Sequence, residues 1–144
     1  MRSTLTHSDA GDVQHRQRRP IRRWAAWSYF GFGMLFILCI IIQVFFAGVG
    51  ILVSGSWMIA HAALGSNLVL LPIVLLALSF AARLPGALKW LTLLLFVLVA
   101  LQPVLIYVRA SAIAILAGLH TVNALAIFTL SLFVNRHIWR LLHT

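Results

Sequence analysis

The stretch Phe30–Val53, FGFGMLFILCIIIQVFFAGVGILV, contains no charged residue and a single amide, Gln43. About 20 consecutive apolar residues cross the hydrocarbon core of a bilayer as an α-helix, so this run is long enough to span a membrane. It is also longer than the roughly 7–15 apolar residues of a signal peptide, and a long polar segment precedes it, so we expect it to be retained. The run predicts an integral membrane protein.

Three more apolar runs follow, at residues 57–81, 88–108 and 112–134. Turn-forming residues separate the runs, at 54–56, 83–86 and 109–111. Pro72 lies inside the second run and predicts a kink there. Connections this short make neighbouring helices antiparallel. The expected fold class is therefore all-α, a four-transmembrane-helix up-down-up-down bundle.

The distribution of charge agrees with four crossings. The 144 residues include eleven Lys and Arg but only two Asp and Glu, a formal net charge of +9. Ten of the eleven basic residues fall on one side of the predicted bundle, and only Arg109 falls on the other. This positive-inside pattern predicts a multi-pass protein of the plasma membrane with both termini in the cytoplasm. The basic residues would lie against anionic lipid, so we expect the lipid bilayer and no nucleic acid as a partner.

The chain divides into three predicted parts. Residues 1–23 are polar and basic, and we expect a disordered cytoplasmic arm. Residues 24–135 form the membrane bundle, and residues 136–144 a basic cytoplasmic tail. Cys39, the single cysteine, lies inside the first run and can form no internal disulfide.

The predicted membrane helices contain no Asp or Glu, and two histidines lie inside them, His61 in the second and His120 in the fourth. An ionisable residue inside a membrane is a functional hypothesis by default. Imidazole is a ligand for iron, copper and zinc, and helix bundles hold cofactors between facing helices. We therefore predict that His61 and His120 ligate one haem b. The alternative is that the two histidines only form hydrogen bonds between helices.

Small residues and one arginine fit the same prediction. Gly65 and Ala124 follow His61 and His120 by four residues, which places open space on the same helix face for a flat macrocycle. Arg109 could pair with a haem propionate, or it could anchor the chain at the membrane interface.

A faint internal repeat links the polar residues. A shift of 59 positions lays Gln43 on Gln102 and His61 on His120, so each predicted hairpin reads Gln, seventeen residues, His. Such parallel repeats build some membrane bundles. The repeat is imperfect, because the turn at 54–56 overlies residues 113–115 of the fourth predicted helix, and duplication stays open.

The amides of the repeat have two interpretations. We expect Gln43, Gln102 and Asn123 mainly to form interhelical hydrogen bonds, and as the alternative to orient the histidines. The depth of the histidines argues against shared ligation. His61 is about four residues into its predicted helix and His120 about nine, an offset of roughly 7 Å at 1.5 Å per residue.

Several segments resemble a family of small four-helix bacterial membrane proteins of unknown function, and the resemblance covers nearly all of residues 30–135. These segments are Gln43–Gly48, His61–Gly65, Leu101–Pro103 and Leu119–Leu125. The layout is also similar to one half of heme A synthase, which implies an axial histidine pair at His61 and His120. The chain departs from that enzyme at Met58, where the enzyme has an acidic residue, and it lacks the long outer loop and cysteine pair.

The functional prediction is a haem-binding or electron-relay subunit that works with a quinone or a larger membrane redox complex. No residue in the predicted membrane helices suggests a catalytic acid, base or nucleophile, so we do not expect an enzyme. A non-catalytic accessory or assembly subunit without cofactor is the first alternative. A small transporter or metal-handling protein is the second, and the absence of intramembrane carboxylates weakens it.

Overall fold

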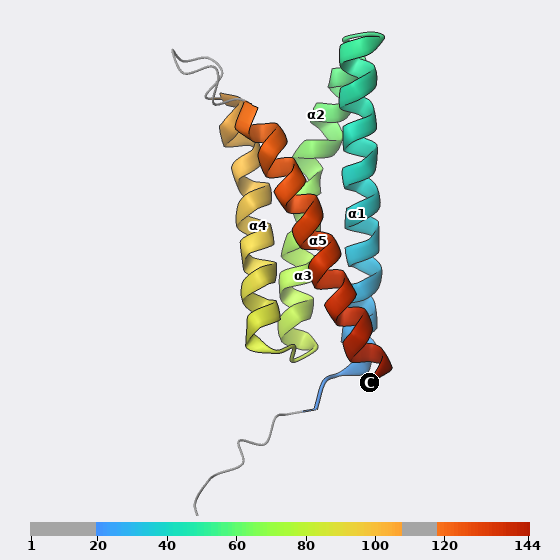
Figure 1. Cartoon of the computed structure of the whole chain (residues 1–144), viewed down its shortest axis with the longest axis vertical. Coiled ribbons are helices and arrows are strands. Elements are labelled where there is room, and N and C mark those ends of the chain that lie inside the picture. The colour runs from blue at the N-terminus through green and yellow to red at the C-terminus, as the bar shows by residue number, and fades with distance from the viewer. Residues whose placement is uncertain (1–19, 108–117) are drawn as a thin grey trace, which may run out of the picture.

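The apolar runs fold as helices wherever the structure describes them. The structure is a computed structural model that describes residues 20–107 and 118–144. Its helices are α1 (Arg23–Leu52), α2 (Trp57–Leu68), α3 (Leu70–Ala81), α4 (Gly86–Tyr107) and α5 (Leu119–His143). Because α2 and α3 are two parts of one run, these residues form four helical segments, and they include no strand. The segments make an up-down-up-down bundle, as predicted (Figure 1).

Three of the four segments are long and apolar enough to cross a membrane. They are α1, the combined α2–α3 segment and α4. Over its described residues α5 does not meet the same criterion. The reason is its polar content, since two asparagines, three histidines and two arginines lie within its length.

The predicted kink lies at Val69, three residues before Pro72. A proline has no N–H to donate, and its ring clashes with the carbonyl four residues earlier, here that of Leu68. The helix α2 accordingly ends at Leu68 and α3 begins at Leu70. Val69 keeps helical backbone angles, so α3 follows α2 directly, with a change of direction between the two (Figure 1).

Two helix ends differ from the sequence expectation. The helix α1 begins at Arg23 instead of residue 30, because its first turns pack into the bundle and Ala25 is fully buried. The helix α5 continues to His143 instead of ending at 134, because Ile138 is also fully buried. Residues 136–143 are therefore the last turns of α5 and not a separate tail.

A Schellman motif ends α3. The N–H of Arg83 donates to the Phe80 carbonyl at 3.0 Å, and the N–H of Leu84 donates to the Ser79 carbonyl at 3.1 Å. The motif needs a left-handed residue after the helix, a place that glycine usually fills. Here Arg83 takes it, with a φ of 57°.

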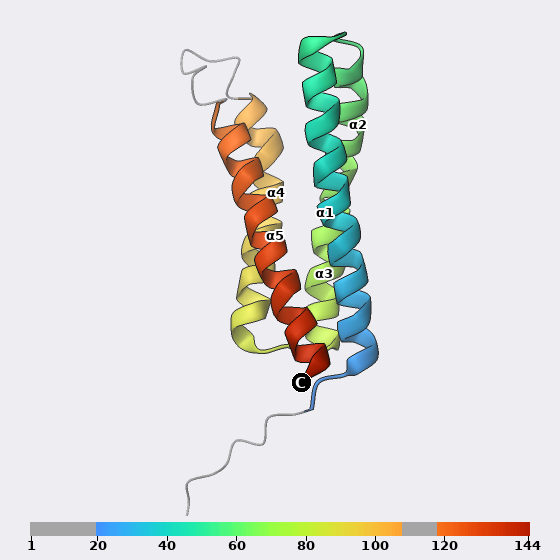
Figure 2. The same ribbon diagram turned by 45° about the vertical axis from the view of Figure 1, so that its right-hand side comes forward.

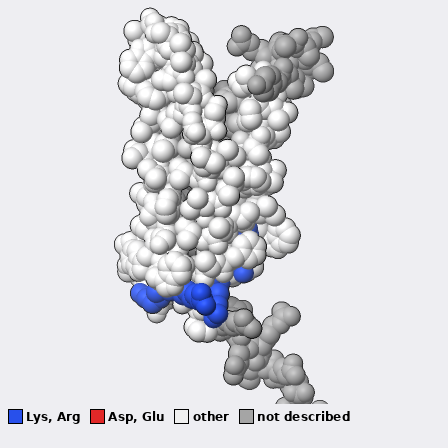
Figure 3. Space-filling model, turned by 180° about the vertical axis from the view of Figure 1, so that it is seen from behind, with Lys and Arg blue, Asp and Glu red and all other residues white. Residues whose placement is uncertain are grey.

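The basic side chains of the described residues lie at one end of the bundle (Figure 3). They are Arg22, Arg23, Arg83, Lys89, Arg136 and Arg140. The guanidinium of Arg23 donates to the Leu142 carbonyl at 2.8 Å, so it ties the start of α1 to the end of α5. We call this half of the bundle, residues 20–40, 70–99 and 123–144, the basic half.

The packed core lies in the basic half. The buried residues of α1 end at Ile40, and α2 has none. We call the other half, residues 41–68, 100–107 and 118–122, the histidine half. There α2 packs beside α1, and this pair diverges from α4 and α5 (Figure 2). The first hairpin, formed by α1 and the α2–α3 segment, and the second hairpin, formed by α4 and α5, are thus joined mainly through the basic half.

Candidate functional site

The structure brings the two predicted ligands together. His61 is the fifth residue of α2 and His120 the second residue of α5. Their ring centroids are 6.4 Å apart and the ring planes meet at 64°. Both side chains are half-buried. The expected offset of roughly 7 Å counted from residue 112, which lies outside the described residues, so the offset stays a prediction, and the two rings are close to each other in the structure.

Each histidine is held by a main-chain carbonyl of the preceding helix. Nδ1 of His61 lies 3.1 Å from the Gln43 carbonyl oxygen, and Nδ1 of His120 lies 3.3 Å from the Gln102 carbonyl oxygen. A carbonyl oxygen can only accept, so Nδ1 carries the proton in both rings. In a neutral imidazole the free electron pair is then on Nε2. Both rings are fixed in the same tautomer, with Nε2 available to a ligand.

These two hydrogen bonds have the sequence spacing of the predicted repeat. In each hairpin the histidine bonds to the residue 18 positions before it. The sequence predicted that Gln43 and Gln102 would act through their side chains, whereas the main-chain carbonyl makes the contact to the histidine. Residues 113–115, where the repeat is imperfect, lie outside the described residues.

The side chains of the two glutamines share another property. Oε1 of Gln43 and Oε1 of Gln102 are both buried, and neither has a hydrogen-bond partner among the described residues. A porphyrin offers no obvious donor to a carbonyl oxygen, so these two atoms do not support haem in the way the imidazoles do.

The space beside Gly65 is not open as predicted. A Cβ at this position would lie 2.5 Å from Nε2 of Gln43, so the glutamine amide fills the place one turn below His61. Gly65 therefore accommodates Gln43 in this structure. Ala124, the equivalent residue on α5, is half-buried one turn below His120.

Asn123 forms the interhelical hydrogen bond expected of it. Its Nδ2 donates to the Leu98 carbonyl of α4 at 2.8 Å, and the side chain is buried. This bond holds α5 against α4 one turn from His120. Arg109 lies outside the described residues, so its pairing with a propionate stays a prediction.

The donor set limits what the site can bind. Among residues 20–107 and 118–144, no group of three or more His, Cys, Asp or Glu could hold a metal ion. Structural zinc sites usually have four such ligands. Two imidazoles are sufficient only when the rest of the coordination comes from elsewhere, and the four pyrrole nitrogens of a haem meet that requirement.

Comparison with known proteins gives one match. Residues 43–112 match the model of a family of unknown function (DUF6220). No curated protein and no solved structure matches the chain. The predicted likeness to heme A synthase therefore finds no support and stays a prediction. The matched segment begins at Gln43 and includes His61 and Gln102 but ends before His120, and over that segment the chain is similar to this uncharacterised family.

Proposed function

We propose that this protein is a small integral membrane subunit that binds one haem b between His61 and His120. The observation that carries the proposal is the pair of matching hydrogen bonds from Nδ1 to a main-chain carbonyl. Histidines that ligate metals characteristically donate their other ring N–H in this way, which fixes the tautomer and the ring orientation.

The separation of the two rings is one at which both imidazoles could hold the same metal centre. An imidazole nitrogen lies about 2.0–2.1 Å from a bound metal and about 1.1 Å from its own ring centroid, so opposed rings have centroids about 6.3 Å apart. By the same arithmetic, two rings at a tetrahedral angle have centroids about 5.1 Å apart. The observed separation of 6.4 Å lies near the larger of these two values, which supports His61 and His120 as the residues that would hold one metal centre between them.

The packing of the two halves supports the same location. The histidine half has little buried apolar surface, and no residue of α2 is buried. A bound macrocycle would supply apolar contact there, between two hairpins that the basic half already holds together. When bound, the haem would supply one-electron redox chemistry. The chain's own residues would hold it, with both rings oriented by the Nδ1 bonds to main-chain carbonyls.

Haem binding is tested by absorption spectroscopy of the protein expressed with added haem and purified in detergent. We expect a Soret band and, after reduction, the sharp bands of a low-spin six-coordinate haem. Single His61→Ala and His120→Ala variants should lose the low-spin bands, and the double variant should retain no haem. His137→Ala is the matched control, because Nδ1 of His137 bonds within its own helix, to the Phe133 carbonyl at 2.9 Å.

Absence of a Soret band in the wild type would refute the proposal, as would an unchanged band in the double variant. Stable co-purification of the haem-free protein with a membrane complex would then favour the accessory-subunit alternative.

We further propose that the bundle crosses the plasma membrane four times with its basic half toward the cytoplasm. The support is the collection of Arg and Lys at one end (Figure 3), which matches the positive-inside pattern. In a Cys39→Ser background, Gly55→Cys places a thiol in the exposed α1–α2 turn and Thr144→Cys places one at the basic end. A membrane-impermeant maleimide should label only Gly55→Cys in right-side-out vesicles. Labelling of Thr144→Cys in the same sealed vesicles would indicate the opposite orientation, with the basic half outside.

A further inference from the structure

A buried asparagine in the basic half has no part in the histidine site. The side chain of Asn135, on α5, is only 4% exposed. Neither its Nδ2 nor its Oδ1 has a hydrogen-bond partner among the described residues. Buried polar groups are nearly always satisfied, by protein or by ordered water, because an unpaired one is destabilising. Two unpaired atoms on one buried amide therefore point to a ligand.

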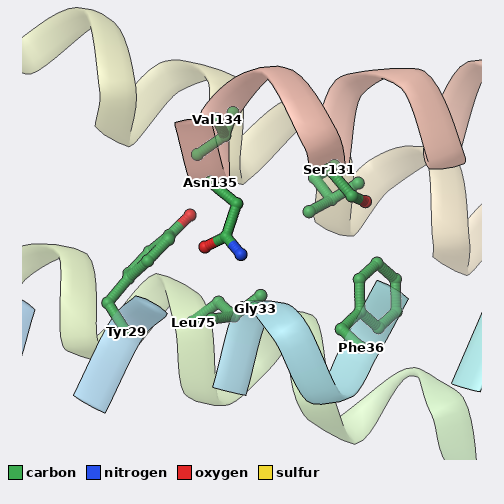
Figure 4. Close-up of a pocket in the computed structure, with 8 residues that line it drawn as sticks. Tyr29, Gly33, Phe36, Leu75, Ser131, Val134 and Asn135 are labelled. Atoms are coloured by element: carbon green, nitrogen blue, oxygen red, sulfur yellow. The ribbon is translucent and has the colours of Figure 1, made fainter. Parts of the chain in front are cut away.

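The amide of Asn135 faces a small cavity between α1, α3, α4 and α5. Figure 4 shows it directed from α5 toward α1, with the Tyr29 hydroxyl on the same side. Gly33, Leu75 and Ser131 also line the cavity. The volume open to the centre of a water-sized sphere is about 10 Å³. That is close to the minimum of about 10–15 Å³ that one water molecule needs.

The hydroxyl of Ser131 can only accept a hydrogen bond from the cavity. Its proton is used in a bond to the Ile127 carbonyl at 2.6 Å, which is a contact within α5. The lone pairs of Ser131 Oγ remain, next to the unpaired amide one turn further along the helix.

The hydroxyl of Tyr29 can likewise only accept a hydrogen bond from the cavity, because its own proton is used in another bond. Thr92 donates its proton to the Leu88 carbonyl at 2.8 Å. The 2.7 Å bond between the hydroxyls of Tyr29 and Thr92 must then be donated by Tyr29. The cavity is thus lined by three oxygen acceptors, on Ser131, Tyr29 and Asn135, and by one donor group, Nδ2 of Asn135.

From this arrangement we infer that the cavity is a binding site for a single ordered water molecule. Water can donate two hydrogen bonds to these oxygens and accept one from Nδ2, and buried waters typically make about three. A metal cation fits the site poorly, because an amide N–H group faces the cavity and the described residues contain no carboxylate side chain. The water would join α5 to α1, and through Thr92 to α4, so it would hold the two hairpins together.

Nuclear magnetic resonance of asparagine-labelled protein in micelles tests the inference. Rotating-frame Overhauser effects distinguish a nearby bound water from chemical exchange by their sign. We expect a dipolar cross-peak from water to the Asn135 side-chain amide. The internal control is the buried amide of Asn123, which donates to the Leu98 carbonyl and should show no such cross-peak. An Asn135 amide without a dipolar water signal would overturn the inference.

A pair of serine variants gives a second readout. Ser131→Ala removes one acceptor of the proposed water, whereas Ser66→Ala removes a hydroxyl with the same bond to its own helix, to the Ala62 carbonyl at 2.8 Å, on an exposed face. We expect Ser131→Ala to weaken the Asn135 water signal and to lower the Tm by several degrees, and Ser66→Ala to change neither. Equal effects of the two substitutions would contradict the inference.

Discussion

Gly33 of α1 lies directly against the side chain of Asn135 of α5, at a contact between the two hairpins. A Cβ on Gly33 would lie 2.5 Å from Oδ1 and 3.0 Å from Cγ of Asn135. Asn135 is buried at this point and the cavity beside its amide is only about 10 Å³, so its side chain has little room to move away. Gly31, two residues before Gly33 in α1, is exposed, and a Cβ there would meet nothing within 4 Å. Substitution of alanine at Gly31 changes only helix propensity, whereas substitution of alanine at Gly33 changes helix propensity and packing. The difference in stability between the two variants therefore measures the packing effect.

The magnitudes can be worked out from these contacts. Gly→Ala inside a helix gains roughly 1 kcal/mol of helix propensity at either position. At Gly33 the added methyl must separate α1 from α5 by up to about 1 Å, and overpacking of this kind costs about 1–3 kcal/mol. We expect Gly31→Ala to stabilise the protein slightly. Gly33→Ala should be less stable than Gly31→Ala by about 1–3 kcal/mol.

The assay is unfolding of the purified protein from mild detergent into sodium dodecyl sulfate, followed by circular dichroism at 222 nm. Equal stabilities for the two alanine variants would refute the close approach of α1 and α5. A Gly33→Ala variant more stable than Gly31→Ala would refute it more strongly. Both substitutions lie far along α1 from the histidine half, so neither depends on haem.

Three further predictions use the same unfolding assay. Arg83→Gly should stabilise the protein by about 1 kcal/mol, because Arg83 holds a φ of 57° that glycine adopts freely, whereas Arg83→Ala should not. Tyr29→Phe should destabilise it by about 1 kcal/mol, since the buried bond to Thr92 is lost; no change would show that this bond contributes nothing. Asn123→Leu should cost about 1 kcal/mol through loss of its bond to α4, and Asn67→Leu, whose amide is exposed and bonds within α2, should be neutral.

Much of the architecture followed from the order of apolar and polar residues. The helical segments, the kink near Pro72 and the collection of basic residues at one end were all predicted. Each depends on local quantities: the transfer free energy of consecutive side chains, the missing N–H of proline and the short connections. The ends of α1 and α5 were missed, because burial of Ala25 and Ile138 by other helices extends those helices beyond the apolar runs on which the prediction was based.

The contacts inside the bundle were decided by the tertiary structure. Because α1 is apolar on every side, its sequence does not mark which face turns inward. Only the packing of all four segments determines helix rotation, and with it three contacts: the 6.4 Å separation of His61 and His120, their bonds to main-chain carbonyls, and the amide of Gln43 beside Gly65. The sequence determined that two histidines lie in a bundle of long apolar helices. Their shared tautomer depends on the positions of main-chain carbonyls, which no residue type encodes.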